Sequence, residues 1–163
     1  MKIFFSHGKE SGPWGSKIKA LAEIARNKGL AIESIDYQGI ESPDERAEKL
    51  VKILDQETEA YLLVGSSMGG YVSVVASQSC KAKGLFLLAP ALYLEGYQQQ
   101  DYQPSGEITV VHGWEDEIIP YANSVTFCQQ QDCNLHLIAG DHRLNSSLPV
   151  VLPLFEEFIN TMQ

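Results

Sequence analysis

The stretch Gly65-Ser66-Ser67-Met68-Gly69-Gly70 decides how this chain folds. It follows the apolar run 60–64 and precedes the segment 69–79, which carries small residues on the side that would face a sheet. A G-x-S-x-G pattern between a strand and a helix is typical of a sharp turn that exposes the central serine above the sheet edge. The stretch therefore predicts a strand–turn–helix unit with Ser67 as an exposed nucleophile and the Met68 N–H directed at a developing oxyanion.

Two other interpretations of this stretch stay open at the level of sequence. A turn rich in glycine and serine can simply begin a helix, since such residues suit turns for conformational reasons alone. A phosphate-binding loop is the second alternative, but the stretch lacks the G-K-[ST] ending and its lysine.

Outward from this unit, short apolar runs alternate with amphipathic segments. Strands are predicted at 2–5, 30–35, 60–64, 85–88, 108–111 and 135–138. Helices are predicted at 14–28, 42–54, 69–79, 121–131 and 148–162. The alternation predicts an α/β protein with a mostly parallel sheet of about six strands, covered on both faces as a three-layer α/β/α sandwich. The length of 163 residues and the absence of a low-complexity linker predict one domain over 1–163.

Capping residues mark several of the helix ends. Ser42 followed by Pro43 predicts the start of a helix, because serine caps the first turn and proline fits it. Gly29 predicts the stop of the helix before it. Pro153 lies inside the last predicted helix and leaves the start of that helix open.

Charge and cysteine content bound the partners and the compartment. The chain has 21 acidic and 12 basic residues, a net charge of −9, and no Lys/Arg cluster, so nucleic acid and anionic membrane are not expected partners. Three cysteines suggest free thiols in a reducing compartment. The apolar run 3–5 is too short for a signal peptide, and no apolar stretch approaches the ~20 residues that span a bilayer. We expect a cytoplasmic protein.

A serine nucleophile needs a base, and the base needs an acid that orients it. His142 follows the last predicted strand, and Asp116 lies after the fifth strand within His112-Gly113-x-x-Asp116-x-x-x-Pro120. Ser67, Asp116 and His142 each come at the carboxyl end of a predicted strand, where parallel sheets collect their sites. We expect them to act together, although Asp116 could also be an exposed loop carboxylate and His142 could cap a turn.

On these residues the chain resembles the α/β-hydrolases, particularly the small lidless esterase-like members of the YqiA type. The motifs that carry the resemblance are Phe5-Ser6-His7-Gly8, Gly65–Gly70, His112–Pro120 and Gly140-Asp141-His142. The resemblance implies a minimal α/β-hydrolase fold that lacks the first two antiparallel strands and a cap domain, with only residues 89–106 in the cap's place. It also implies an oxyanion hole made by the backbone N–H groups of Lys9 and Met68.

The implied chemistry is a two-step acyl transfer on a small-molecule ester or thioester, without a metal or organic cofactor. Ser67 is the nucleophile, His142 the general base and then acid, and Asp116 its orienting partner. Residues expected beside the substrate are His7, Gly8, Trp14, Leu92 and Tyr93, with Leu94, Tyr97 and Tyr102 as further aromatic and apolar candidates. Trp14 could instead anchor a helix in the core, and the tyrosines could be surface aromatics. No heptad pattern predicts an oligomer.

Two different functions remain as alternatives. A non-catalytic binding or scaffold protein could use the same fold, because fold alone does not establish function. A zinc site is the second alternative, since Cys128-x4-Cys133-x2-His136-x5-His142 holds suitable ligand types. That set would have to bridge a helix and a strand.

Overall fold

Six parallel strands form one sheet at the centre of the molecule. The structure is a computed structural model that describes residues 1–163. The strands are β1 (Lys2–Ser6), β2 (Ala31–Ile35), β3 (Tyr61–Ser66), β4 (Gly84–Leu88), β5 (Glu107–Gly113) and β6 (Asn134–Ile138). Their order is β2-β1-β3-β4-β5-β6, and every neighbouring pair is parallel. All six predicted strands are thus confirmed.

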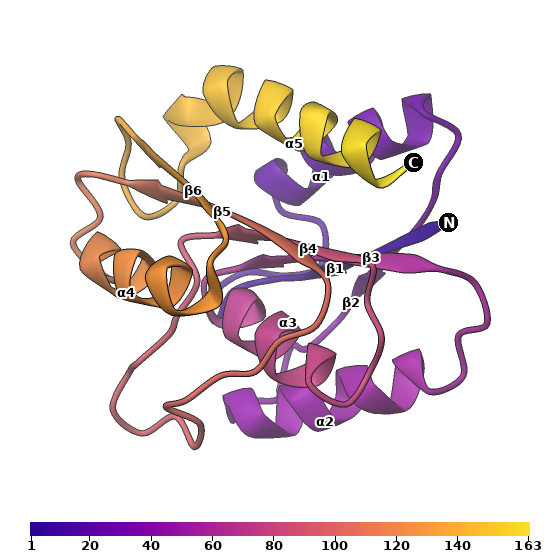
Figure 1. Cartoon of the computed structure of the whole chain (residues 1–163), viewed down its shortest axis with the longest axis horizontal. Helices are drawn as coiled ribbons and strands as arrows, with labels where there is room; N and C mark the ends of the chain where they lie inside the picture. The colour runs from indigo at the N-terminus through magenta and orange to yellow at the C-terminus, as the bar shows by residue number, and fades with distance from the viewer.

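Helices cover both faces of this sheet, as predicted. They are α1 (Ser16–Asn27), α2 (Pro43–Leu54), α3 (Met68–Ser77), α4 (Tyr121–Gln131) and α5 (Leu148–Met162), with the short 3₁₀ turn η1 (Asn145–Ser147) before α5. Helices α1 and α5 lie on one face, and α2, α3 and α4 lie on the other (Figure 1). No cap domain is present, because residues 89–106 form neither helix nor strand.

The two faces of the sheet bury two separate apolar clusters. Along β1, Phe4 belongs to the cluster under α2, α3 and α4, whereas Ile3 and Phe5 belong to the cluster under α1 and α5. This alternation follows from the period of two in a strand, which sends neighbouring side chains to opposite faces. A sheet buried on both faces needs continuous apolar strands, and that is the pattern of the sequence.

Two helix ends form as their capping residues predict. The Ser42 Oγ accepts a hydrogen bond from the Glu45 N–H at 3.2 Å at the start of α2. Gly29 ends α1 with a φ of +75°, and the N–H of Leu30 then reaches the carbonyl of Ala25 at 3.1 Å. That pairing satisfies carbonyls that the helix itself leaves free.

The first residues of α1 and α5 differ in how well the sequence predicted them. Helix α1 begins at Ser16 with Gly15 as its cap, so the prediction that the helix includes Trp14 was two residues too long. Helix α5 begins at Leu148 and contains Pro153, so this proline does not displace its start.

The strand order places a topological switch point at the carboxyl ends of β1 and β3. The chain leaves β1 for β2 on one side and returns to β3 on the other, so the connections after β1 and β3 diverge. Ligand sites of open parallel sheets lie at such a switch point, beyond the carboxyl ends of the strands. His7 and Gly8 follow β1 at this point, and Ser67 follows β3.

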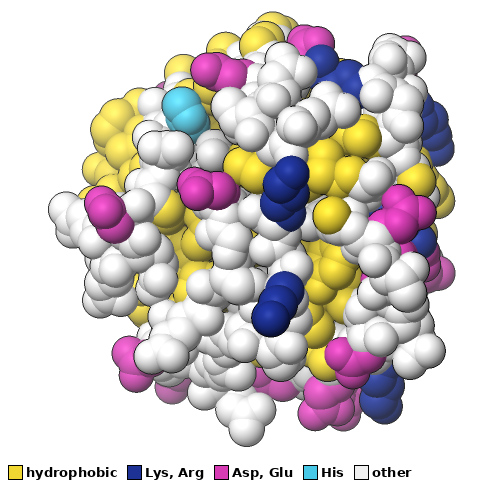
Figure 2. Space-filling model, turned by 45° about the vertical axis from the view of Figure 1, so that its right-hand side comes forward, with side chains coloured by type: hydrophobic (Ala, Val, Ile, Leu, Met, Phe, Trp, Pro, Cys, Tyr) yellow, Lys and Arg dark blue, Asp and Glu magenta, His cyan; other side chains and the backbone are white.

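The surface is acidic overall and has no broad basic face in view. On the face shown in Figure 2, Lys and Arg side chains lie singly among acidic and uncharged ones. No helix of the chain combines the length and the apolar character that crossing a membrane would require.

Helix α3 approaches β1 more closely than any side chain would allow. A Cβ placed on Gly69 would lie 1.9 Å from the carbonyl oxygen of Ser6, and one on Gly65 would lie 2.3 Å from the carbonyl oxygen of Gly69. Both obstacles are backbone atoms, which cannot rotate out of the way. The two glycines of the motif are therefore requirements of packing.

We expect Gly69→Ala to lower the free energy of unfolding by about 3 kcal/mol or more, because the new methyl group must push α3 away from β1. Urea denaturation followed by circular dichroism measures this change. Gly15→Ala is the matched control, since nothing lies within 4 Å of its added Cβ. Equal stability of Gly69→Ala and the wild type would show that the close approach is not a constraint.

Candidate active site

Ser67 occupies a strained turn between β3 and α3. Its φ is +54° and its ψ is −117°. Residues other than glycine rarely adopt this backbone conformation, which costs roughly 1–3 kcal/mol. Backbone hydrogen bonds hold it there, because the Ser67 N–H donates to Leu88 at 3.0 Å and the Ser67 carbonyl accepts from Ala91 at 2.9 Å. The turn lifts the Ser67 side chain out of the sheet, as the motif predicts.

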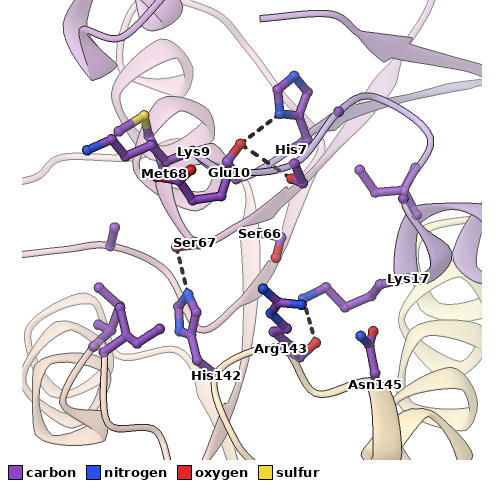
Figure 3. A pocket seen from close by; sticks show the side chains of 18 of the residues that line it. His7, Lys9, Glu10, Lys17, Ser66, Ser67, Met68, His142, Arg143 and Asn145 are labelled. Carbon is purple, nitrogen blue, oxygen red and sulfur yellow. Dashed lines mark hydrogen bonds between the residues drawn. The ribbon is translucent and has the colours of Figure 1, made fainter. Parts of the chain in front are cut away.

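The structure brings Ser67, His142 and Asp116 together in one line of hydrogen bonds. The Ser67 Oγ lies 2.9 Å from His142 Nε2 (Figure 3), and His142 Nδ1 lies 2.7 Å from Asp116 Oδ2. An ionised carboxylate only accepts, so Nδ1 carries the imidazole proton and Nε2 is free to accept from the serine hydroxyl. These contacts join segments that are 75 and 26 residues apart in the sequence.

The side chain of Asp116 is fully buried, yet its carboxylate is well compensated. Its Oδ1 accepts from the backbone N–H groups of Ile118 at 2.9 Å and Ile119 at 2.8 Å. Burial alone would raise the pKa of Asp116, but the hydrogen bonds from His142 and these two N–H groups outweigh it and hold the pKa below its usual value. Asp116 is therefore not the exposed loop carboxylate that the sequence also allowed.

A second histidine contacts the same carboxylate, and the sequence did not single it out for this. His112 is completely buried, with Nε2 3.0 Å from both Asp116 Oδ2 and the carbonyl of Ile119. Its Nδ1 lies 2.7 Å from the hydroxyl of Ser124. Burial lowers the pKa of His112, so the ring is neutral, with Nε2–H as donor and Nδ1 as acceptor from Ser124. The only signal in the sequence was its spacing from Asp116.

Two backbone N–H groups near Ser67 are free to bind a ligand. Met68 is the first residue of α3, so its N–H has no acceptor within the helix. Lys9 lines the same cavity, and its N–H makes no hydrogen bond in the structure. The preceding residue, Gly8, lies beside Ser67, since a Cβ on it would be in ordinary van der Waals contact with the Ser67 Cβ at 3.5 Å.

The loop after β1 is held in place from behind. The Gly8 carbonyl accepts from His7 Nδ1 at 2.7 Å and from Arg46 Nη1 at 3.2 Å. His7 Nε2 in turn accepts from the N–H of Tyr37 at 2.9 Å. The backbone at Gly8 and Lys9 is thus fixed beside Ser67.

A cavity of about 590 Å³ opens above Ser67 and His142. It extends from the loop after β1 and the start of α1 to the segments that follow β4, β5 and β6. Its lining comprises residues 7–12, 15–18, 66–68, 118–119 and 142–143, with Ala91, Leu94, Tyr97 and Asn145.

Several expected substrate contacts do not reach this cavity. Trp14 stands outside it, 40% exposed, with the Arg26 guanidinium over its ring; it is not a core anchor either. Leu92 is completely buried in the core, and Tyr93 turns its hydroxyl to the side chain of Gln130. The predictions that Trp14, Leu92 and Tyr93 line the substrate site were therefore wrong.

The prediction that His7 contacts the substrate was only partly right. It borders the cavity through its position in the loop, but its imidazole is buried and turned away from Ser67 (Figure 3). Its role is to hold the loop, since both ring nitrogens are engaged by backbone groups. Of the other candidates, Gly8, Leu94 and Tyr97 do line the cavity, while Tyr102 is buried against Tyr71, Tyr93 and Phe127.

The cysteine and histidine set considered for zinc does not assemble. Cys128 and Cys133 lie at the end of α4 and just beyond it, whereas His142 bonds with Ser67 and Asp116. No three His, Cys, Asp or Glu side chains in the chain are grouped as metal ligands would be. The zinc alternative was therefore wrong.

Solved structures with this fold come from several bacteria. XCC1541 of Xanthomonas campestris pv. campestris, for which an α/β-superfamily hydrolase activity is suggested, is 29% identical with a TM-score of 0.90, over 98% of this chain and 97% of that one. Est1E of Butyrivibrio proteoclasticus is 20% identical with a TM-score of 0.84, over 99% and 87% of the two chains. XC6422 of Xanthomonas campestris, described as a serine hydrolase without a lid, is 21% identical with a TM-score of 0.73, over 98% and 81%.

These likenesses establish the α/β-hydrolase fold without a cap domain that the sequence motifs implied. Among curated proteins, none matches the chain. A family model described as the uncharacterised protein family UPF0227 matches residues 2–102, which is more than half of the chain. The chain therefore belongs to the UPF0227 family, the YqiA type of α/β-hydrolase.

Proposed function

We propose that this protein is a serine hydrolase that cleaves a carboxylic ester or thioester through an acyl-enzyme intermediate. The observation that carries the proposal is the unbroken line from the Ser67 hydroxyl to His142 at 2.9 Å and on to Asp116 at 2.7 Å. A hydroxyl is a weak nucleophile until a base within hydrogen-bonding reach can take its proton. Here the base is present, and an acid orients it.

In the first step, His142 Nε2 takes the hydroxyl proton as Ser67 Oγ attacks the carbonyl carbon of the substrate. The oxyanion that forms accepts hydrogen bonds from the N–H groups of Met68 and Lys9. Each such donor typically contributes about 10²–10³ to kcat, because it is already oriented before the charge develops. Asp116 stays ionised and stabilises the imidazolium of His142.

In the second step, the tetrahedral intermediate collapses and His142 gives its proton to the departing alcohol or thiol. A water molecule then attacks the acyl ester of Ser67 with His142 again as the base, which releases a carboxylate and restores the serine. Without a cap over the cavity, small-molecule esters and thioesters with large leaving groups can enter.

We expect a fluorophosphonate to add once to the wild type and not to Ser67→Ala, because only a serine paired with a base attacks phosphorus readily. Intact-protein mass spectrometry measures the adduct. Ser66→Ala is a matched control that removes the neighbouring hydroxyl and keeps the adduct. An unlabelled, folded wild type would contradict the proposal and favour the non-catalytic binding protein.

We also expect kcat/KM for a neutral ester to fall as the pH decreases below neutral. The general base must be unprotonated to accept the serine proton, and histidine is the side chain whose charge ordinarily changes between about pH 5 and 8. The pKa of Asp116 is held below its usual value, so this carboxylate stays ionised across the same range and adds no second loss. Stopped assays across mildly acidic to alkaline pH, with circular dichroism to confirm folding, measure the profile. A flat profile through the acidic range would argue against His142 as the base.

A further inference from the structure

The charge of the cavity is opposite to that of the chain. Three cations line it, Lys9, Lys17 and Arg143, and Glu10 is the one carboxylate in its lining. The whole chain has 12 basic and 21 acidic residues. A cavity that gathers cations on an acidic protein attracts negatively charged ligands over short distances.

Lys17 and Arg143 lie next to each other beside Ser67 and His142 (Figure 3). The Lys17 Nζ donates to the backbone carbonyl of Arg143 at 2.9 Å, and neither side chain forms an ion pair with a carboxylate. Burial lowers the pKa of Lys17 to about 8, against the opposing charges of Asp141 and Asp116, and the charge of Arg143 makes a smaller contribution in the same direction as burial. A bound anion would compensate the ammonium charge that burial disfavours at Lys17.

The first turn of α1 belongs to the same wall. Gly15 caps α1 without a side-chain hydrogen bond, no acidic residue occupies the first turn, and residues 15–18 line the cavity. The first N–H groups of a helix have no intrahelical acceptor and carry a partial positive charge. These N–H groups add to the charges of Lys17 and Arg143, which remain the main positive charges of this wall.

The other half of the cavity is mostly apolar, with Lys9 and Glu10 beside Met68 (Figure 3). Its lining residues are Met68, Ala91, Leu94, Tyr97, Ile118 and Ile119. Met68, Ala91 and Ile119 belong to the core cluster on the face of α2, α3 and α4, whereas α1 packs on the opposite face with α5. In Figure 3, Ser67 lies between Met68 on one side and Lys17 with Arg143 on the other, so a scissile bond at Ser67 would have the two cations on one side and the Met68 side on the other.

From these observations we propose that Lys17 and Arg143 bind an anionic group, a carboxylate or phosphate, of the ester or thioester substrate. The apolar half then takes the hydrocarbon part. This inference rests on the proposed hydrolase function and specifies its substrate class.

Matched pairs of esters test this inference. On the acyl side, mono-4-nitrophenyl adipate is compared with 4-nitrophenyl hexanoate, which has a methyl group in place of the carboxylate. On the leaving-group side, the acetate ester of 4-hydroxybenzoate is compared with that of 4-hydroxybenzamide. We expect the charged member of at least one pair to have the higher kcat/KM. We expect the charged-to-neutral ratio to fall about tenfold in Lys17→Met and in Arg143→Met, or about 1.4 kcal/mol.

Lys19→Met is the control, because Lys19 is exposed on α1 and does not line the cavity; it should keep the wild-type ratio. The ratio does not depend on how much of each variant is folded. An equal ratio in the wild type and both cavity variants, with esters still cleaved, would overturn the anion site and leave the hydrolase standing.

Binding without turnover tests the anion site independently. Calorimetric titration with adipate and with inorganic phosphate should show binding to the wild type that weakens in Lys17→Met, and the stronger of the two identifies the preferred anion. Binding that is absent, or unchanged in Lys17→Met, would overturn the anion site even if no ester is cleaved. A failure of fluorophosphonate labelling, by contrast, would overturn the hydrolase.

His112 shares the Asp116 Oδ2 with His142. We infer that His112 is a positioning residue that restrains how strongly Asp116 stabilises the protonated form of His142. An N–H that donates to the carboxylate disperses part of its charge and leaves less for the second imidazole. The ionisable groups that face His112 are Asp116 and His142, and Ser124 from α4 fixes the other side of its ring.

The acid midpoint of the pH profile of kcat/KM tests this role. In His112→Leu the midpoint should rise by roughly half a pH unit, since the full carboxylate charge then favours protonated His142. His112→Gln supplies an N–H donor again and should return the midpoint toward that of the wild type. Midpoints do not depend on the active fraction, so partial misfolding does not obscure them.

Ser124→Ala offers a second route, because it removes the hydroxyl that fixes the ring of His112 while leaving the core side chains in place; its midpoint should move in the same direction. Identical midpoints in the wild type and in the His112 and Ser124 variants would show that His112 only fills space.

Discussion

The buried carboxylate of Asp116 is the interaction on which the rest of the site depends. A charge without solvent contact is costly unless several donors surround it, and this one receives four, two backbone N–H groups on Oδ1 and two imidazoles on Oδ2. The donors come from three places in the chain, namely the end of β5, the loop that follows it and the loop after β6. Each donor lost would leave buried charge uncompensated, so the four contacts fix the loops relative to one another. His142 can face Ser67 only because this anchor holds it from behind.

The other half of the site depends on backbone packing. Ser67 keeps its positive φ because hydrogen bonds to Leu88 and Ala91 hold the turn from both sides. Gly69 lets α3 press against the end of β1, which brings the loop at Gly8 beside Ser67. One close approach thus sets both the angle of the nucleophile and the place of the neighbouring N–H groups. The strained conformation of Ser67 persists because the contacts of the sheet and α3 hold the turn in place.

Local rules explain how much of this could be predicted from the sequence. Apolar runs, Gly29 and Ser42 marked the elements because strand period and helix caps are properties of adjacent residues. Ser67, Asp116 and His142 could be grouped because parallel strands end at one edge, and the structure does bring them into contact. The cavity lining could not be predicted in the same way. Whether Leu92 and Tyr93 line the cavity depends on the path of the coil after β4, which has a φ of +59° at Tyr93. No sequence periodicity exists there from which that path could be predicted. The contact of His112 with Asp116 depends on the fold of an intervening turn.

The net charge of the chain and the local charge of the cavity act on a ligand over different distances. A net charge of −9 repels anions at long range, but screening at physiological ionic strength confines that repulsion to about 8 Å. Selection for an anion would therefore depend on contact inside the cavity, where Lys17 and Arg143 lie. Lys17 also donates to the backbone of Arg143, the residue next to His142. The group that would contact the substrate thus also steadies the loop that carries the base. The Lys17 ammonium has three N–H donors, so it can bind an anion while it still donates to that carbonyl, and one side chain then serves both binding and the loop that carries His142.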